Sequence, residues 1–134
     1  MATKNRSAVA IIRGNKILLF HRKKDDNTYY ILPGGGIESE ETPLQAARRE
    51  IKEELDIDIQ ILKKLTEFEN RGQIEYYYLT ENFSGEVNAV GDNQNNANIE
   101  DEALWVEINN LNGINLLPEK IKYYLVDYFK NRKG

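Results

Sequence analysis

Three glutamates within one short stretch of the chain have the residue type and the spacing to do chemistry. Glu50, Glu53 and Glu54 fall within an arc of about 100° on a helix, because each helical residue turns by about 100°. Glu50 and Glu54 are like-charged neighbours four residues apart, which costs an isolated helix roughly 0.2–0.5 kcal/mol. A divalent cation bound between them would reverse that cost. Three carboxylates and water predict an octahedral Mg²⁺ or Mn²⁺ site with positions open for phosphate oxygens.

The same three glutamates are also typical of an ordinary solvent-exposed helix face. Arg48, Arg49 and Lys52 lie among them and could form ion pairs with them. The helical spacing alone leaves both interpretations open.

The rest of the composition limits the available chemistry. The sequence has no cysteine, and its single histidine is His21. Disulfides, thiolate zinc sites, cysteine nucleophiles and H-E-x-x-H zinc sites are therefore excluded. The net charge of −4 argues against a protein that holds a nucleic-acid polymer by charge alone. A nucleotide stays open as a ligand, because a bound metal ion can supply positive charge.

The length of 134 residues is typical of one domain, so we expect a single domain over residues 1–134. The longest apolar runs fall far short of the ~20 residues that span a bilayer. The apolar run at residues 8–12 is too short for a signal peptide. We therefore expect a soluble, cytoplasmic protein without a membrane partner.

The acidic stretch is predicted to lie on a helix that begins after Glu41. Thr42 is expected at the N-cap, Pro43 at the first helical position and Gln45 at the third, which forms a capping box. Asp56 is expected at the end of the helix. An apolar stripe is predicted on the opposite side, at helical spacing: Leu44, Ala47, Ile51 and Leu55.

Short apolar runs around this helix predict strands. They lie at residues 8–12, 17–20, 29–32, 57–61, 65–70, 74–79 and 104–108. Gly14-Asn15 is a hairpin signal, and residues 71–73 are expected to form a three-residue hairpin loop. A second helix is predicted at about residues 118–130, with an aromatic stripe that is either core or the face of a homodimer. Two helices around a mixed sheet predict an α/β sandwich.

One segment closely matches a known motif. Gly35-x5-Glu41-x7-Arg49-Glu50-Ile51-x-Glu53-Glu54-x-Asp56-Ile57 resembles the Nudix box, G-x5-E-x7-R-E-U-x-E-E-x-G-U, where U is a bulky aliphatic residue. Every fixed position agrees except the last glycine, which is Asp56 here. The resemblance extends more loosely to residues 32–36 and to the stretch from Glu100 to Val106. The chain therefore resembles Nudix hydrolases, which implies a Nudix-type α/β/α sandwich with a mixed β-sheet.

The resemblance implies roles for individual residues. Glu50, Glu53 and Glu54 match the metal-binding carboxylates, and the carbonyl of Gly34 matches a backbone metal ligand. Of these, Glu53 and Glu54 are the expected catalytic residues, because one of the last two glutamates often handles the attacking water. The implied cofactor is Mg²⁺ or Mn²⁺.

The resemblance also implies a structural pair and a conformation. Glu41 and Arg49 match positions that brace the loop against the helix. The family glycine after the helix is expected to be left-handed, a conformation that Asp56 tolerates at some cost. The departure leaves the implied metal ligands in place.

Two further features keep alternative interpretations. Glu100 and Glu102 could supply an additional acid, although a solvent-exposed acidic cluster explains them equally well. Residues 88–98 contain five asparagines and few apolar residues, so we expect a mobile loop that is better ordered with nucleotide bound.

The implied reaction is metal-dependent hydrolysis of the diphosphate linkage of a nucleoside diphosphate derivative. A canonical or oxidised nucleoside triphosphate is the leading substrate class, and a nucleotide sugar or a dinucleotide is the alternative. A different possibility is a Nudix-like module that senses a nucleotide without cleaving it. Loss of box carboxylates would favour the sensor, and none is lost here.

Overall fold

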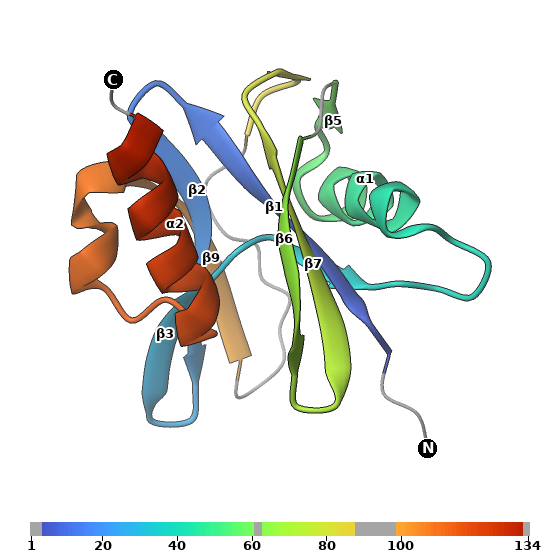
Figure 1. The fold of residues 1–134 in the computed structure, drawn as a ribbon, viewed down its shortest axis with the longest axis horizontal. Coiled ribbons are helices and arrows are strands. Elements are labelled where there is room, and N and C mark those ends of the chain that lie inside the picture. Colours follow the sequence, from blue (N-terminus) through green and yellow to red (C-terminus); the bar gives the residue numbers. More distant parts are fainter. Residues whose placement is uncertain (1–3, 61–62, 88–98, 133–134) are drawn as a thin grey trace. The chain divides into compact units, whose positions relative to one another are not determined.

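Strand β1 (Arg6–Arg13) lies at the centre of a mixed sheet. Its central residues are small or β-branched and fully buried, as an interior strand requires. β1 pairs in parallel with β7 (Gln73–Thr80) and antiparallel with β4 (Gly34–Gly36). β7 pairs antiparallel with β6 (Lys63–Asn70). The expected mixed character of the sheet is confirmed within these four strands (Figure 1).

The computed structural model describes residues 4–60, 63–87 and 99–132. The chain divides into two units, each built from two separate stretches of sequence. The first is Met1–Ile12 with Leu32–Asn88, and the second is Arg13–Ile31 with Ala89–Gly134. The loop expected to be mobile, residues 88–98, lies outside the described residues. The expectation of a single domain stays a prediction.

Helix α1 (Pro43–Leu55) begins where the capping signals predicted. The Thr42 side chain accepts a hydrogen bond from the Gln45 backbone at 3.1 Å, and the Gln45 side chain accepts one from the Thr42 backbone at 2.9 Å. The expected stripe is wrong at Leu44, which is 39 % exposed in the first turn. The buried face includes Ala46 in its place, and its members are Ala46, Ala47, Ile51 and Leu55.

The end of α1 has the expected left-handed residue. Asp56 is the C-cap with φ 57° and ψ 39°, and its N–H donates to the carbonyl of Lys52 at 2.9 Å. The chain then forms the short strand β5 (Asp58–Ile59), which pairs antiparallel with β8 (Phe83–Ser84). Both short strands belong to the first unit.

The β6–β7 hairpin is tighter than the sequence predicted. Asn70 already pairs with Gln73, so the connection is a two-residue loop and the expected three-residue loop is wrong. Both loop residues have positive φ, 56° at Arg71 and 84° at Gly72. Positive φ at both central positions is typical of a type I′ turn, whose twist matches the flanking strands.

The second unit has its own strands. β2 (Lys16–Lys24) pairs antiparallel with β3 (Asn27–Ile31) and with β9 (Ile99–Glu107). β9 begins five residues before the predicted strand. The predicted last residue, Ile108, instead begins the 3₁₀ helix η1.

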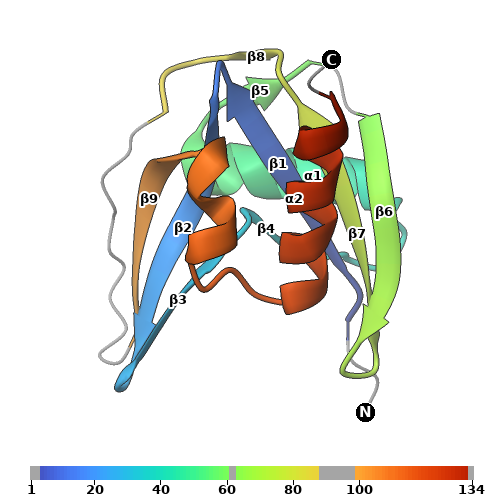
Figure 2. The ribbon, with the colours of Figure 1, turned by 60° about the vertical axis from the view of Figure 1, so that its left-hand side comes forward.

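Two helices complete the second unit. η1 (Ile108–Gly113) is in contact with α2 (Glu119–Arg132), as Figure 2 shows. The buried apolar residues of these helices and their connection include Leu111, Leu116, Ile121 and Leu125. Within the part of the chain that the structure describes, no helix is long and apolar enough to cross a membrane.

Candidate active site

Two glycines of β4 lie directly against two glutamates of α1. The N–H of Gly34 donates to Oε1 of Glu54 at 3.2 Å. A Cβ atom on Gly35 would lie 2.4 Å from the carboxyl carbon of Glu50 and 2.5 Å from each of its oxygens. No side chain fits at Gly35 unless the Glu50 carboxylate moves. Strand β4 therefore seats two of the three carboxylates that were predicted as metal ligands.

Strand β1 fixes the position of these glycines. β4 runs along β1 with Ala8 opposite Gly34 and Ser7 opposite Gly35. A Cβ on Gly34, whose φ is 157°, would lie 2.2 Å from the Ser7 carbonyl oxygen. The buried Ser7 hydroxyl also donates to the carbonyl of Pro43 at 2.7 Å. One residue of β1 thus contacts both the glycine strand and the first turn of α1.

Arg49 ties the loop before α1 to the helix. Its Nε donates to Glu41 Oε2 at 2.6 Å and its Nη2 donates to Glu41 Oε1 at 2.9 Å. Nη2 also donates to the carbonyl of Gly36 at 3.0 Å. The other end of the loop is held by the Glu38 N–H, which donates to Glu41 Oε1 at 2.9 Å. The structure therefore brings together the two residues that were expected to brace this loop.

The same guanidinium also contacts the remaining acids of the site. Arg49 Nη1 donates to Glu50 Oε2 at 3.1 Å and to Glu53 Oε1 at 3.3 Å. The Glu50 side chain is only 16 % exposed, whereas the Glu53 side chain is 59 % exposed. The guanidinium charge offsets the like-charge repulsion that the sequence predicted on this helix face. Glu53 is the glutamate with the greater freedom to turn toward a ligand.

Ionisation within this group follows from the bidentate ion pair. The hydrogen bonds from Arg49, followed by the backbone N–H of Glu38, lower the pKa of Glu41 from its usual value near 4.5 to about 2. The Glu41 carboxylate in turn raises the pKa of Arg49. Glu41 is therefore ionised throughout the physiological pH range, and the pair stays charged.

The donor atoms at this site fit a hard divalent cation. Carboxylate oxygens and backbone carbonyls are the ligands that Mg²⁺ prefers, and the Gly35 cradle holds the Glu50 carboxylate beside the backbone. In the described ranges, no three acidic or imidazole side chains already converge closely enough to hold an ion. Glu50 and Glu53 are directed to Arg49 instead. A cation at this position would compete with Arg49 for the exposed Glu53.

The two further acids named from sequence lie on β9, in the second unit. In the antiparallel register Glu100 stands opposite Lys23, and Glu102 stands opposite His21. The register thus places residues of basic type on β2 beside both acids. Their role as additional acids of the active site stays a prediction.

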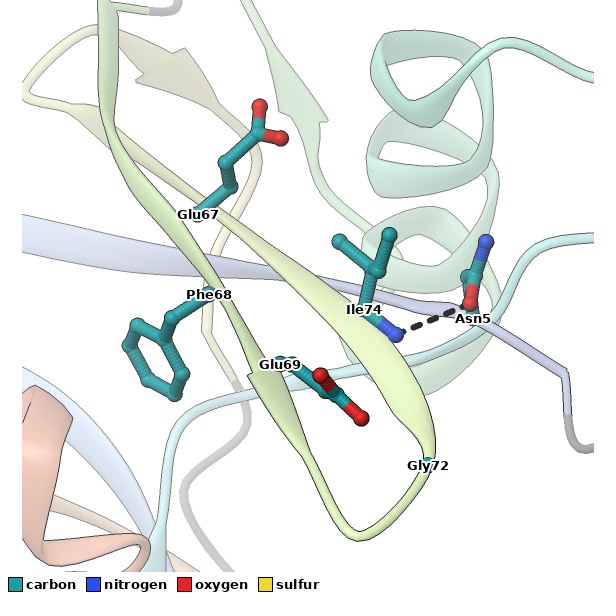
Figure 3. Close-up of a pocket in the computed structure, with 6 residues that line it drawn as sticks. All are labelled: Asn5, Glu67, Phe68, Glu69, Gly72 and Ile74. Atoms are coloured by element: carbon teal, nitrogen blue, oxygen red, sulfur yellow. Dashed lines mark hydrogen bonds between the residues drawn. The ribbon is translucent and has the colours of Figure 1, made fainter.

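A pocket lies on the β6–β7 hairpin, and the carboxylates of α1 are not part of its lining. Figure 3 shows its lining, with the Ile74 N–H donating to the Asn5 side-chain oxygen at 2.9 Å. The pocket is lined by Asn5, Glu67, Phe68, Glu69, Gly72 and Ile74. None of these residues was predicted to be functional, and none of the predicted site residues lines this pocket.

Two features of the site were not predicted from the sequence. The contact between Gly35 and Glu50 joins residues fifteen positions apart, although the run of glycines did indicate close backbone approach. The contribution of Ser7 carried no sequence signal, because a serine in a strand is ordinarily unremarkable. Both features depend on which strand lies beside β4.

Comparison with known proteins agrees with this arrangement. A family model described as the NUDIX domain matches residues 3–127, and the chain belongs to this family. No curated protein matches the chain. Several solved structures are similar to it.

A MutT NUDIX hydrolase from Burkholderia pseudomallei is 26 % identical, with a TM-score of 0.65 over 79 % of this chain and 84 % of that one. The Escherichia coli ORF135 protein is 24 % identical, with a TM-score of 0.74 over 99 % and 93 %. A MutT structure from a study of Aliivibrio salmonicida and Vibrio cholerae is 21 % identical, with a TM-score of 0.72 over 93 % and 98 %. The expected Nudix fold class is thereby confirmed.

Proposed function

We propose that this chain is a divalent-metal-dependent hydrolase that cleaves the diphosphate linkage of a nucleoside diphosphate derivative. The observation that carries the proposal is the seating of glutamates of α1 against the backbone of Gly34 and Gly35, in a chain of the NUDIX domain family. A purely structural acidic helix would not require a glycine whose Cβ position is filled by a carboxylate.

The proposed metal ligands are Glu50, Glu53, Glu54 and the carbonyl of Gly34, with Mg²⁺ or Mn²⁺ as the ion. Such an ion neutralises charge on phosphate oxygens and lowers the pKa of water. Glu53 and Glu54 are the proposed catalytic residues, one of which accepts the proton of the attacking water as general base. Water adds to one phosphorus, and the bond from that phosphorus to the bridging oxygen breaks.

Arg49 has two tasks in this proposal. Its bidentate contact with Glu41 keeps the loop on the helix throughout the reaction. Its third nitrogen, Nη1, holds Glu50 and Glu53 while no cation is bound. The longer of these two contacts, 3.3 Å to the exposed Glu53, is the one expected to break first.

The leading substrate class is a canonical or oxidised nucleoside triphosphate. Two of the solved structures compared above are named MutT. The extended sequence signatures that mark NADH-type and coenzyme A-type relatives are not recognisable in this sequence. Nucleotide sugars and dinucleotides are the alternative substrates. Glu100 and Glu102 are proposed as further acids, to be tested separately.

The test is a panel of nucleoside triphosphates, oxidised triphosphates, nucleotide sugars and dinucleotides, each with Mg²⁺, Mn²⁺ or EDTA. Products are identified by mass, and reaction in ¹⁸O-water shows which phosphorus is attacked. We expect metal-dependent release of two phosphate-containing products from a triphosphate. Faster cleavage of a nucleotide sugar or a dinucleotide would replace the substrate class. Binding without cleavage under every condition would instead establish a nucleotide sensor.

A further inference from the structure

Arg6, the first residue of β1, lies between the glycine strand and the β6–β7 hairpin. It stands opposite Gly36 in the antiparallel register with β4 and opposite Glu75 in the parallel register with β7. Its Nη2 donates to the carbonyl oxygen of Leu32 at 2.9 Å, in a partly buried position. The guanidinium therefore holds the chain two residues before the glycine that seats Glu54.

The segment that Arg6 holds leads directly into the candidate active site. Leu32 is buried, and the carbonyl of the next residue, Pro33, accepts from the Val9 N–H at 2.9 Å. Gly34 then donates its N–H to Glu54. Only one residue separates the carbonyl that Arg6 holds from the amide that contacts Glu54.

A buried polar group lies on the other side of Arg6. Glu75 is 3 % exposed and accepts the hydroxyl of Tyr77 at 2.5 Å. Its second oxygen accepts from Asn70 at 2.9 Å and from Gln73 at 3.0 Å. In the described part of the chain, no buried side-chain nitrogen or oxygen lacks a hydrogen-bond partner. The buried carboxylate is thus fixed in position opposite Arg6.

The pKa of the Tyr77 hydroxyl depends on both Glu75 and the Arg6 guanidinium. Burial is the largest cause that raises the pKa of Tyr77, followed by its hydrogen bond to Glu75. Arg6 acts in the opposite direction through its charge and a hydrogen bond. The Arg6 guanidinium, which binds the carbonyl of Leu32, therefore also lowers the pKa of Tyr77.

We propose that Arg6 is a positioning residue for the candidate active site, joining the Glu75–Tyr77 pair on β7 to the Leu32 carbonyl and so fixing the glycine backbone that seats Glu50 and Glu54. This inference rests on the proposed function. Arg6 touches neither of the two glutamates in the contacts described above, so it acts through the backbone. Removing a residue that orients metal ligands typically weakens metal binding or activity by about 10–100-fold.

A residue that only anchors the end of a strand would behave differently. Its loss would lower the melting temperature without changing the affinity of a correctly folded protein for a cation. Metal affinity, measured without nucleotide, therefore separates positioning from anchoring. Arg13 provides a matched control, because it is an exposed arginine at the other end of the same strand. Its Cζ lies 4.3 Å from the centroid of the Trp105 ring.

The experiment measures Mn²⁺ affinity by electron paramagnetic resonance for the wild type, Arg6→Gln, Arg6→Lys and Arg13→Gln. Arg6→Gln is expected to bind Mn²⁺ at least about tenfold more weakly. Arg13→Gln should match the wild type. Arg6→Lys should recover most of the affinity, because an ammonium group can also donate to the Leu32 carbonyl. Equal affinity in Arg6→Gln and the wild type would overturn the inference.

Amide hydrogen exchange gives a second readout. In Arg6→Gln the Gly34 amide should exchange faster than in the wild type, while the Ile51 amide in the middle of α1 keeps its wild-type rate. Unchanged exchange at Gly34 would contradict the inference. If Arg6→Gln does not fold, Arg6→Lys decides by the same two measurements: a small loss of Mn²⁺ affinity with faster Gly34 exchange supports the inference, and wild-type values of both overturn it.

Failure of this inference differs from failure of the proposed function. A wild type that hydrolyses nucleotides, with unchanged Mn²⁺ affinity in Arg6→Gln, overturns only the role of Arg6. A wild type that binds Mn²⁺ but hydrolyses no nucleotide overturns the proposed function, and the Arg6 variants still decide the positioning role. A wild type that binds no Mn²⁺ overturns both.

Discussion

Two acidic stretches look alike in the sequence but differ in what lies opposite them. The glutamates of α1 lie against glycine backbone and one arginine that also binds the preceding loop. Residues 100–102 of β9 stand in strand register with residues 21–23 of β2, which are His, Arg and Lys. The first group lies against backbone that only glycine allows, and the second lies on a strand paired with a stretch of basic residue types.

The difference teaches how a carboxylate becomes available for chemistry. On β9, the acids lie in a regular strand whose register places basic residue types on the neighbouring strand. On α1, one guanidinium serves Glu41, Glu50 and Glu53 together, and Glu53 retains 59 % exposure. A cation can therefore replace part of an existing charge interaction on α1. The predictions below test this contrast, from the largest expected effect to the smallest.

Replacement of Glu53, which is exposed, or of Glu54, which binds the Gly34 amide, should have the largest effect on activity. Glu53→Gln and Glu54→Gln keep size and shape but remove the charge needed by a metal ion or a general base. Each should lower kcat for the best substrate by at least about 10²-fold. Mg²⁺ should raise the melting temperature of the wild type more than that of either variant, because binding stabilises the native state.

Glu69→Gln is the matched control, since Glu69 is an exposed glutamate on β6 that lines the pocket in Figure 3. It should retain wild-type kcat and the wild-type response to Mg²⁺. Without metal, both α1 variants should melt within a few degrees of the wild type, because the reduced like-charge crowding is set against weaker contacts of residue 53 with Arg49 and of residue 54 with Gly34. Wild-type rates and Mg²⁺ responses in both variants would remove the metal site from this helix.

The adjacent glycines Gly35 and Gly36 allow a sharper test of the contact between Gly35 and the Glu50 carboxylate. Gly35→Ala would place its Cβ against the Glu50 carboxylate, whereas Gly36→Ala would meet the flexible Lys4 side chain at 2.9 Å. Both variants should fold, because the contacted atoms lie at the far ends of long side chains. Gly35→Ala should weaken Mn²⁺ binding by about 10-fold or more, and Gly36→Ala should not. Equal affinities would show that the position of Glu50 is unimportant for the cation.

The Glu41–Arg49 pair predicts a pH dependence of stability. The folded-state pKa of Glu41 is depressed to about 2, so its contribution is fully present above the usual pKa near 4.5 and is lost as the pH falls through about 2. Glu41→Gln should therefore melt below the wild type at pH 6, and the gap should shrink steadily toward pH 2. Thermal melts of both proteins across this range provide the measurement. A gap that is constant with pH would show that the ion pair contributes nothing.

Much of the fold around the site could be predicted because its signals are local. Thr42, Pro43 and Gln45 set the start of α1 within a single turn, and Asp56 marks its end. Capping depends on neighbours three or four residues apart, which a sequence displays directly. The box spacing then placed the glutamates on the correct helix.

The remaining features depend on partners that are distant in sequence. β9 extends past its alternating apolar residues because its backbone pairs with β2 as far as Lys24, a partner distant in sequence. The turn of the β6–β7 hairpin consists of two residues, Arg71 and Gly72, because Asn70 already pairs with Gln73. Arg6 opens a strand and gave no functional signal, although it contacts the carbonyl of Leu32 twenty-six residues later.

The acids of β9 should be much less sensitive than those of α1. Glu102 is exposed and stands opposite His21 in the strand register, so Glu102→Gln removes a charge at an exposed position. Its kcat should stay within about threefold of the wild type, and its stability should fall by less than about 1 kcal/mol. A loss of about 10²-fold in kcat with the fold intact would instead establish Glu102 as a further acid of the reaction.

The smallest effect is expected for the acid at the end of α1. Asp56 has φ 57°, a conformation that costs most side chains roughly 1–2 kcal/mol and glycine very little. Its ion pair with Lys52, at 3.2 Å, raises the pKa of that lysine. The Asp56 side chain is 91 % exposed, and such exposed pairs contribute at most about 1 kcal/mol.

Asp56→Gly therefore relieves the left-handed strain, which stabilises the folded state. It also removes the ion pair with Lys52 and gives the unfolded chain more conformational entropy, which both destabilise the folded state. The free energy of unfolding should be unchanged or rise by up to about 1 kcal/mol, a few degrees in melting temperature. Mn²⁺ affinity should match the wild type, because Asp56 is on the acidic helix but not against the glycine strand. A clear fall in melting temperature would show that Asp56 makes a specific stabilising contact. A fall in Mn²⁺ affinity alone would extend the site to the end of α1 and break the contrast between glycine-seated acids and the others.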